Sequence, residues 1–193
     1  MQRSKAQLRA AFLRARREVS RQEHDSDALM LARHLSALVK DALIVCAYVP
    51  IGSEPGSVEL IDGLRAQGVR VLLPVARSDA DGTPQPLQWG EYRPGELVDA
   101  PHGLREPAPP WLAAEAIADA SVILVPALAV DRTGVRLGRG AGFYDRSLPL
   151  ADAAVRLIAV VRDDELVDQL PAEPHDVHMT HALTPRDGLV ALG

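Results

Sequence analysis

Residues 125–146 read VPALAVDRTGVRLGRGAGFYDR, and the interpretation of the whole chain starts from this stretch. The apolar run before it, residues 121–125, predicts a buried strand that stops at Pro126. A loop follows, in which glycines alternate with other residues at positions 138, 140 and 142, and the next helix is expected over about residues 142–148. A buried strand, a glycine-rich loop and a helix in this order are typical of α/β proteins.

The loop carries the residue types of an anion site. Glycines let backbone N–H groups approach an anion closely, and Arg136, Arg139 and Arg146 offer forks of donors for phosphate or carboxylate oxygens. Tyr144 and Asp145 add a hydroxyl and a carboxylate suited to magnesium. The alternative is a tight turn with ordinary solvated arginines. The density of such residues favours a phosphate site, although neither a Walker A loop nor a dinucleotide fingerprint is present.

Outward from the loop, the pattern alternates between helices and apolar strands. Helices are expected over residues 5–19, 20–39 and 58–67, and strands over residues 43–49, 69–73 and 155–161, with a last strand after residues 175–184. The strand–helix–strand unit over residues 43–73 implies a parallel sheet. Residues 75–110 are irregular, as in a functional flap, a short helix follows at 111–116, and residues 167–174 suggest a helix or turn.

Composition narrows the class of protein. The 193 residues suit one domain, 1–193, and a hydrophobic content of 47% with 24% charged residues is that of an ordinary globular protein. A net charge of −5 argues against a nucleic-acid binder, and no apolar run could cross a membrane. The single cysteine, Cys46, is expected to be buried. We expect a cytoplasmic location. The first 21 residues carry seven basic side chains against one acidic one, and charge alone favours a solvated helix face there.

Two further groups of polar residues lie near the ends of predicted strands. In an open parallel sheet, ligands bind beyond the carboxyl ends of the strands. Glu54 follows the first strand, as a solvated or a functional glutamate. His175, Asp176, His178 and His181 precede the last strand. This cluster allows a zinc site, but spacings of three along an extended segment direct side chains to alternating sides, which favours a solvated loop.

The sequence from Arg136 to Asp145 resembles the signature loop of the 5-formyltetrahydrofolate cyclo-ligase family, also called methenyltetrahydrofolate synthetases. Lys5 and Arg9 match the family's Lys-x-x-x-Arg, and Glu54 to Ser57 matches its Glu-x-x-Thr with Ser for Thr. Residues 103–107 resemble its Gly-x-x-Glu-Pro turn. The resemblance covers nearly the whole chain. It implies an α/β fold, a three-layer single domain with a mixed, mostly parallel central sheet flanked by helices.

The resemblance also implies a site. ATP would be held by Lys5, Arg9, Arg136, Leu137, Gly138, Arg139, Gly140, Ala141, Gly142, Phe143 and Tyr144, and magnesium by Asp145 and Asp176. The folate would be held by Val49, Glu54, Arg139, Gly140, Ala141, Gly142 and Phe143. Arg136, Arg139 and Tyr144 would be catalytic, whereas Arg14, Arg16 and Arg17 would stay solvated. Phe143 replaces the family's usual tyrosine, with loss of a hydroxyl.

The implied reaction converts 5-formyltetrahydrofolate, with or without a polyglutamate tail, to 5,10-methenyltetrahydrofolate at the expense of ATP. The γ-phosphoryl group activates the formyl oxygen, and N10 then attacks the formyl carbon. We expect a monomer that binds neither nucleic acid nor membrane. The alternatives are a nucleotide- or folate-binding protein without turnover, and an ATP-dependent enzyme of the same fold with another substrate.

Overall fold

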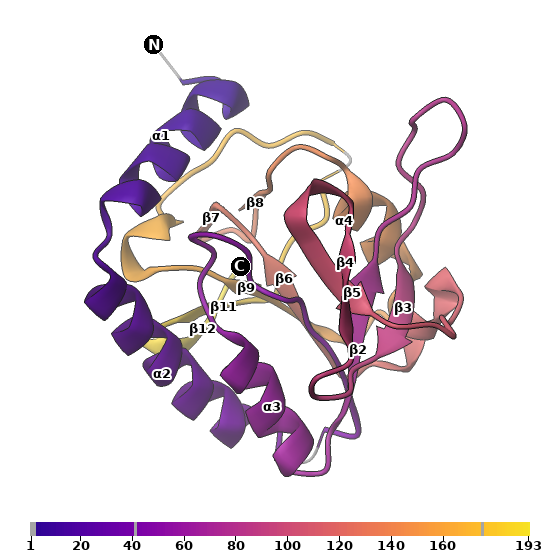
Figure 1. Cartoon of the computed structure of the whole chain (residues 1–193). Helices are drawn as coiled ribbons and strands as arrows, with labels where there is room; N and C mark the ends of the chain where they lie inside the picture. Colours follow the sequence, from indigo (N-terminus) through magenta and orange to yellow (C-terminus); the bar gives the residue numbers. More distant parts are fainter. Residues whose placement is uncertain (1–2, 41, 175) are drawn as a thin grey trace.

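The computed structural model describes residues 3–40, 42–174 and 176–193, and a seven-stranded sheet forms its centre (Figure 1). The strand order is β12-β11-β9-β6-β1-β2-β3. The strands are β1 (Ile44–Cys46), β2 (Arg70–Val75), β3 (Gln88–Glu91), β6 (Val122–Pro126), β9 (Arg156–Val160), β11 (His181–Thr184) and β12 (Gly188–Ala191). The five inner strands are parallel, and β3 and β12 pair antiparallel at the edges. The mixed, mostly parallel sheet is therefore confirmed.

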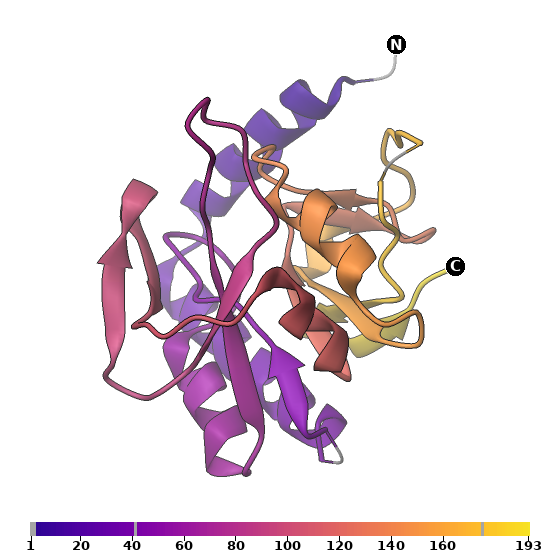
Figure 2. The ribbon, with the colours of Figure 1, turned by 90° about the vertical axis from the view of Figure 1, so that its right-hand side faces the viewer.

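Helices cover both faces of this sheet. On one face, α2 (Arg21–Leu38) and α3 (Val58–Ala66) pack leucines and isoleucines against the apolar strands. The other face is covered by the short helices α4 (Phe143–Ser147), η2 (Ala114–Asp119) and η3 (Leu148–Leu150). Figures 1 and 2 show these groups on opposite sides of the sheet, which gives the expected three layers.

A small second sheet supports the glycine-rich segment. Residues 126–141 were expected to be a loop, but β7 (Ala129–Asp131) and β8 (Arg136–Leu137) form a hairpin that pairs with β10 (Leu166–Val167). The helix α1 (Lys5–Glu18) packs Leu8 and Phe12 against this sheet. The buried carboxylate of Asp131 accepts backbone N–H groups from Thr133, Val135 and Leu170, and so ties the hairpin to the segment after β10.

The expected flap contains regular structure. Its centre is a hairpin of β4 (Leu97–Ala100) and β5 (Leu104–Pro107), joined by the short helix η1 (Pro101–Gly103). Strand β2 continues through Pro74, which was expected to end it. Proline is tolerated there because β1 ends opposite Leu72, so Pro74 has a partner strand on one side only.

Other boundaries also differ from expectation. The first strand was expected to reach residue 49 but ends at Cys46, and the helix expected at 111–116 is the 3-10 helix η2 at Ala114–Asp119. Where a helix or turn was expected at 167–174, no helix forms, and the segment after β10 is irregular except for a turn at Pro174. The 3-10 helix η4 (Asp163–Glu165) was not predicted, and where one last strand was expected after residues 175–184 the chain forms two, β11 and β12.

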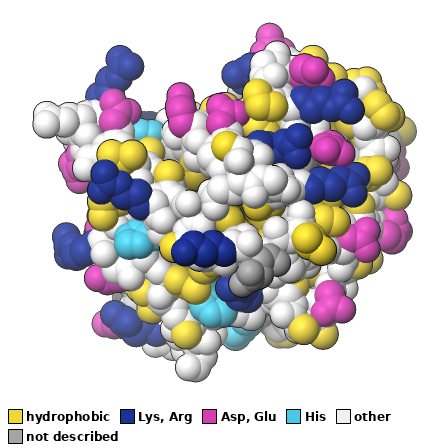
Figure 3. Space-filling view, turned by 90° about the horizontal axis from the view of Figure 1, so that it is seen from below, with side chains coloured by type: hydrophobic (Ala, Val, Ile, Leu, Met, Phe, Trp, Pro, Cys, Tyr) yellow, Lys and Arg dark blue, Asp and Glu magenta, His cyan; other side chains and the backbone are white. Residues whose placement is uncertain are grey.

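The molecular surface is of mixed charge where Figure 3 shows it, with acidic and basic side chains interspersed. No helix in the described ranges has both the length and the apolar character needed to cross a membrane.

Candidate active site

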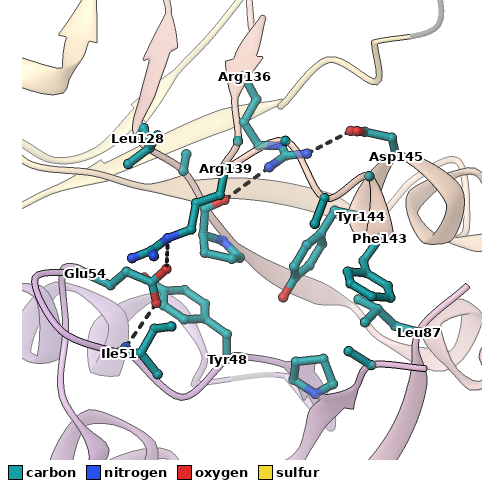
Figure 4. A pocket seen from close by; sticks show the side chains of 18 of the residues that line it. Tyr48, Ile51, Glu54, Leu87, Leu128, Arg136, Arg139, Phe143, Tyr144 and Asp145 are labelled. Carbon is teal, nitrogen blue, oxygen red and sulfur yellow. Dashed lines mark hydrogen bonds and ion pairs between the residues drawn. The ribbon is translucent and has the colours of Figure 1, made fainter. Parts of the chain in front are cut away.

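A cavity of about 510 Å³ opens beyond the carboxyl ends of β1 and β6. The chain after β1 contributes Tyr48, Val49 and Glu54, and the chain after β6 contributes Pro126 to Leu128. The glycine loop (residues 136–142) and β5 form further walls, and residues of α1 and of the segment before β11 complete the polar end. Figure 4 shows part of this lining. The cavity volume lies in the range of small-molecule and cofactor sites, about 300–1,000 Å³.

The backbone of the glycine loop is shaped for arginine side chains to lie against it. Gly140 and Gly142 have φ of +97° and +79°, which side-chain-bearing residues rarely adopt. A Cβ on Gly138 would lie 2.6 Å from Arg136 Nη1, and one on Gly140 would lie 3.3 Å from Arg9 Cζ. Gly140 and Gly142 are therefore favoured by conformation, and a Cβ on Gly138 would displace the Arg136 guanidinium.

Arg136 holds the loop to its surroundings. Its Nη1 donates to the carbonyl of Pro126 (3.2 Å) and its Nη2 to Asp145 Oδ1 (2.8 Å). The guanidinium lies 5.7 Å from the centre of the Tyr144 ring, and the side chain is only 8% exposed. Arg136 thus connects the end of β6 to α4 and places a fixed positive charge behind the loop.

Lys5 and Arg9 reach the same end of the cavity from α1. Arg9 Nε donates to the carbonyl of Gly138 (2.9 Å), and Lys5 Nζ pairs with Asp176 (2.9 Å) and Glu173 (3.2 Å). Burial lowers the pKa of Lys5, but the hydrogen bonds and negative charges of Asp176 and Glu173 outweigh it, so this pKa lies above its ordinary value. The ammonium is therefore charged at neutral pH. Ser4 and Gln7 form a capping box, with Ser4 as the N-cap directly before Lys5, the first helical residue of α1.

Glu54 and Arg139 meet across the cavity. Arg139 Nε lies 2.9 Å from Glu54 Oε1, and Glu54 Oε2 accepts the Ile51 N–H at 3.0 Å (Figure 4). The contact joins the loop after β1 to the glycine loop. Strand β1 neighbours β6 in the central sheet, and the β7–β8 hairpin that follows β6 carries the glycine loop back to the same edge.

The other end of the cavity is largely apolar. Pro74, Ala76, Leu87, Val49 and Phe143 line it. Tyr144 also belongs to this wall, and its buried hydroxyl has no hydrogen-bond partner among the described residues. Burial raises the pKa of Tyr144, so the hydroxyl is neutral at physiological pH and can donate a hydrogen bond.

The residues that the resemblance assigns to ATP, folate and magnesium all line this cavity, with one exception. The exception is Leu137, whose side chain is buried beneath the glycine loop in the cluster with α1 and β7. Arg146 is exposed and its Nη1 donates to the carbonyl of Gly142. Both magnesium candidates, Asp145 and Asp176, face the cavity, and each pairs with a cation as described above.

The histidines of the possible zinc cluster do not converge in the described residues. His178 Nδ1 lies 2.9 Å from the Thr133 carbonyl, and His181 Nδ1 lies 2.8 Å from Thr180 Oγ1. His175 lies outside the described residues. In the ranges that the structure covers, no group of three or more His, Cys, Asp or Glu side chains could hold a metal ion.

The prediction that Arg16 is solvated is wrong. Its side chain is buried, because Nε and Nη2 pair with Glu165 at 2.6 and 2.7 Å and Nη2 also donates to the Ala127 carbonyl. Arg14 and Arg17 are exposed as expected.

The sequence analysis gave no role to two further residues of the cavity, Tyr48 and Glu106. Glu106 is buried in the cavity wall and accepts two hydrogen bonds from Arg77. Glu106 is the glutamate of the Gly-x-x-Glu-Pro turn at residues 103–107, so this motif could have identified it.

The fold and the site together define an α/β protein with a glycine- and arginine-rich cavity at the carboxyl ends of parallel strands. Comparison with known proteins narrows the class further. A model of the 5-formyltetrahydrofolate cyclo-ligase family matches residues 1–185. A 5-formyltetrahydrofolate cyclo-ligase of Mycolicibacterium smegmatis is 64% identical over 98% of each chain. That of Escherichia coli K12 is 31% identical over 73% of this chain and 77% of its own.

A solved structure has the same fold. The Aquifex aeolicus 5,10-methenyltetrahydrofolate synthetase superposes with a TM-score of 0.75 at 22% identity, over 97% of this chain and 92% of its own. The chain belongs to the 5-formyltetrahydrofolate cyclo-ligase family.

Proposed function

We propose that this protein catalyses the ATP- and magnesium-dependent cyclisation of 5-formyltetrahydrofolate to 5,10-methenyltetrahydrofolate, with release of ADP and phosphate. The observation that carries the proposal is the composition of one cavity. Six cationic side chains and the backbone of the glycine loop line it, together with Glu54 and an apolar wall that includes a tyrosine hydroxyl without a hydrogen-bond partner among the described residues. Such a cavity suits a polyanion at one end and a flat, partly polar ring system at the other.

In this proposal, the nucleotide phosphates lie against the glycine loop. Backbone N–H groups of residues 137–144 and the side chains of Lys5, Arg9, Arg136 and Arg139 are the donors, and Leu137 contributes only its backbone. Phosphoryl transfer depends mainly on positioning and on neutralising charge that spreads over the phosphate oxygens. The buried Arg136 supplies a fixed charge, whereas the half-exposed Arg139 can reach toward the transferred group.

The folate takes the apolar end. Val49 and Phe143 pack against its ring, and Glu54 accepts hydrogen bonds from the N–H groups of the pterin. Residues 139–142 are shared between the two ligands, because the loop lies between both ends of the cavity. Tyr144 donates its hydroxyl hydrogen to an oxygen of the reacting groups, the formyl or the phosphoryl oxygen.

The main chemical obstacle of this reaction is a poor leaving group, the oxygen of the formyl amide. An amide oxygen leaves carbon reluctantly, and transfer of the γ-phosphoryl group to the formyl oxygen of the N5-formyl group converts it to a phosphate ester. N10 then attacks the activated carbon and loses its proton, and phosphate departs with the former formyl oxygen. The protein holds N10 close to that carbon, excludes water from the apolar end and balances charge at the phosphates.

Asp145 and Asp176 suit magnesium, because carboxylate oxygens, phosphate oxygens and water are its preferred ligands. Bound there, the ion would neutralise phosphate charge. The ion pairs of these carboxylates with Arg136 and Lys5 orient them toward the cavity.

The test is the absorbance of the methenyl-folate product with purified protein, 5-formyltetrahydrofolate, ATP and magnesium. Product formation that requires every component supports the proposal, and Arg139→Ala should then lose turnover with an unchanged thermal unfolding midpoint. Nucleotide binding without product, or phosphate release without methenyl-folate, would contradict it and favour a binding protein or another substrate.

A further inference from the structure

We propose that Glu54, besides contacting folate, is a positioning residue for Arg139 and aims this arginine at the transferred phosphoryl group. The inference rests on the proposed function and extends it, because it connects the folate end of the cavity to the phosphate end through one ion pair. It is carried by the contact between Arg139 Nε and Glu54 Oε1 at 2.9 Å and by the different anchoring of its two members (Figure 4).

Glu54 is the fixed member of the pair. Its side chain is 10% exposed, and its Oε2 accepts the Ile51 N–H. Its own N–H donates to the Ile51 carbonyl at 3.1 Å, and its carbonyl lies 3.1 Å from His24 Nε2 on α2. The next carbonyl, that of Pro55, accepts the buried Tyr48 hydroxyl at 2.9 Å. Both the backbone and the carboxylate of Glu54 are therefore held from several sides.

Arg139 is the adaptable member. Its side chain is 44% exposed, and it stands between Gly138 and Gly140, of which Gly140 has a left-handed backbone. In the described parts of the chain, Arg139 forms no ion pair except that with Glu54. A long side chain on such a loop samples many rotamers, and a fixed partner restricts them before a ligand arrives.

The form of the contact leaves the functional end of the arginine available. Glu54 meets Nε, and Nη1 and Nη2 form no hydrogen bond to another residue that the structure describes. Two N–H-bearing nitrogens thus remain for phosphate oxygens while Nε stays on the carboxylate. Arg136, by contrast, uses one N–H of each terminal nitrogen for Pro126 and Asp145, so its guanidinium is held in one place and has less freedom to follow a ligand.

The experiment is a double-mutant cycle in kcat at saturating ATP and folate, with Glu54→Gln, Arg139→Gln and both together. If Glu54 acts through Arg139, Glu54→Gln lowers kcat about tenfold alone and less than about twofold in the Arg139→Gln background. The folate KM rises with Glu54→Gln in both backgrounds, since the direct contact with folate does not depend on Arg139. Glu54→Asp keeps the charge but shortens the reach, and should recover only part of kcat.

Glu106→Gln is the matched control. Glu106 is a buried carboxylate of the same cavity that pairs with Arg77, so its effect on kcat should be the same with and without Arg139. Thermal unfolding of each variant checks the fold.

Equal effects of Glu54→Gln on kcat in both backgrounds would overturn the inference, because Glu54 would then act on folate alone. A kcat that rises with Glu54→Gln would also overturn it, since the ion pair would then restrain Arg139. If the wild-type protein forms no methenyl-folate, the proposed function fails before the cycle can be measured, so the two failures are distinguishable.

Discussion

The hydroxyl of Tyr144 offers a test in which stability and activity change in opposite directions. Its oxygen is buried and has no hydrogen-bond partner in the described residues, while the ring packs near the Arg136 guanidinium, with 5.7 Å between Arg136 Cζ and the ring centre. An unsatisfied buried polar group costs about 1–3 kcal/mol. Tyr144→Phe removes that cost and keeps the ring, so we expect the free energy of unfolding to rise by about 1 kcal/mol, the lower end of that range.

Activity should fall in the same variant. If the hydroxyl donates to an oxygen of the reacting groups, its loss removes a hydrogen bond made only in the ligand complex, and kcat should drop about tenfold. Because burial raises the pKa of Tyr144, the hydroxyl stays neutral, and no basic limb of the pH–rate profile should disappear with it. A stable but slow variant is the usual sign of a group kept for function.

Urea unfolding of the wild-type protein and Tyr144→Phe, followed by circular dichroism, measures the first effect. Tyr48→Phe is the control, because the Tyr48 hydroxyl donates to the Pro55 carbonyl at 2.9 Å and its removal should destabilise by about 1–2 kcal/mol. Loss of stability in Tyr144→Phe similar to that of the control would refute the reasoning, as would a stabilised variant with wild-type kcat.

Three further predictions use other parts of the structure. Gly140→Ala introduces strain at φ +97° and a Cβ 3.3 Å from Arg9, so isothermal titration should show weaker nucleotide binding, whereas Gly52→Ala, where φ is also positive but space is open, should not. Asp131→Ala leaves the buried N–H groups of Val135 and Leu170 without their acceptor, and urea unfolding should show a loss of about 3 kcal/mol; a loss below 1 kcal/mol would contradict this. Burial lowers the pKa of His181 in the folded protein below its ordinary value of 6.5. As the pH falls below about 6.5, this histidine therefore binds more protons in the unfolded chain than in the folded protein. Stability should therefore fall as pH drops below about 6.5, and less so in His181→Asn, as measured by thermal unfolding across pH 5–8.

The sheet was predictable because its inner strands are continuous apolar runs. Residues 121–125 and 155–161 are such runs, and they became β6 and β9 with boundaries shifted by one residue. The helices α1 and α2 begin where their Ser capping residues predict. These features depend on local sequence alone, so a single chain suffices to find them.

The short strands could not be predicted in the same way. Strand β8 has two residues and β10 has two, and neither shows an alternation long enough to recognise. They pair because β7 lies between them, and the Asp131 carboxylate holds the surrounding turns. The information for these strands lies in contacts between segments distant in sequence, which a local pattern does not contain.

The candidate site was predictable to a greater extent, for a reason of topology. In a parallel sheet, the chain leaves every strand at the same edge, so residues after β1 and β6 had to lie near one another. Glu54 and residues 127–128 line one cavity for this reason, whereas the glycine loop and Asp176 reach it through the second sheet and the segment before β11. The contact between Glu54 and Arg139 was not predictable, because it depends on side-chain reach across that edge.

Arg16 shows where reasoning from charge fails. Three arginines at positions 14, 16 and 17 look alike in a basic helix, but only Arg16 faces Glu165, a residue 149 positions later in the chain. Arg16 also donates to the carbonyl of Ala127, which lines the cavity. The buried arginine therefore connects α1, which carries Lys5 and Arg9, to the segment that leads into the glycine loop. A buried arginine without its carboxylate leaves an uncompensated charge, which is strongly destabilising. Glu165 therefore fixes the place of α1, and with it the position of Lys5 and Arg9 at the polar end of the cavity.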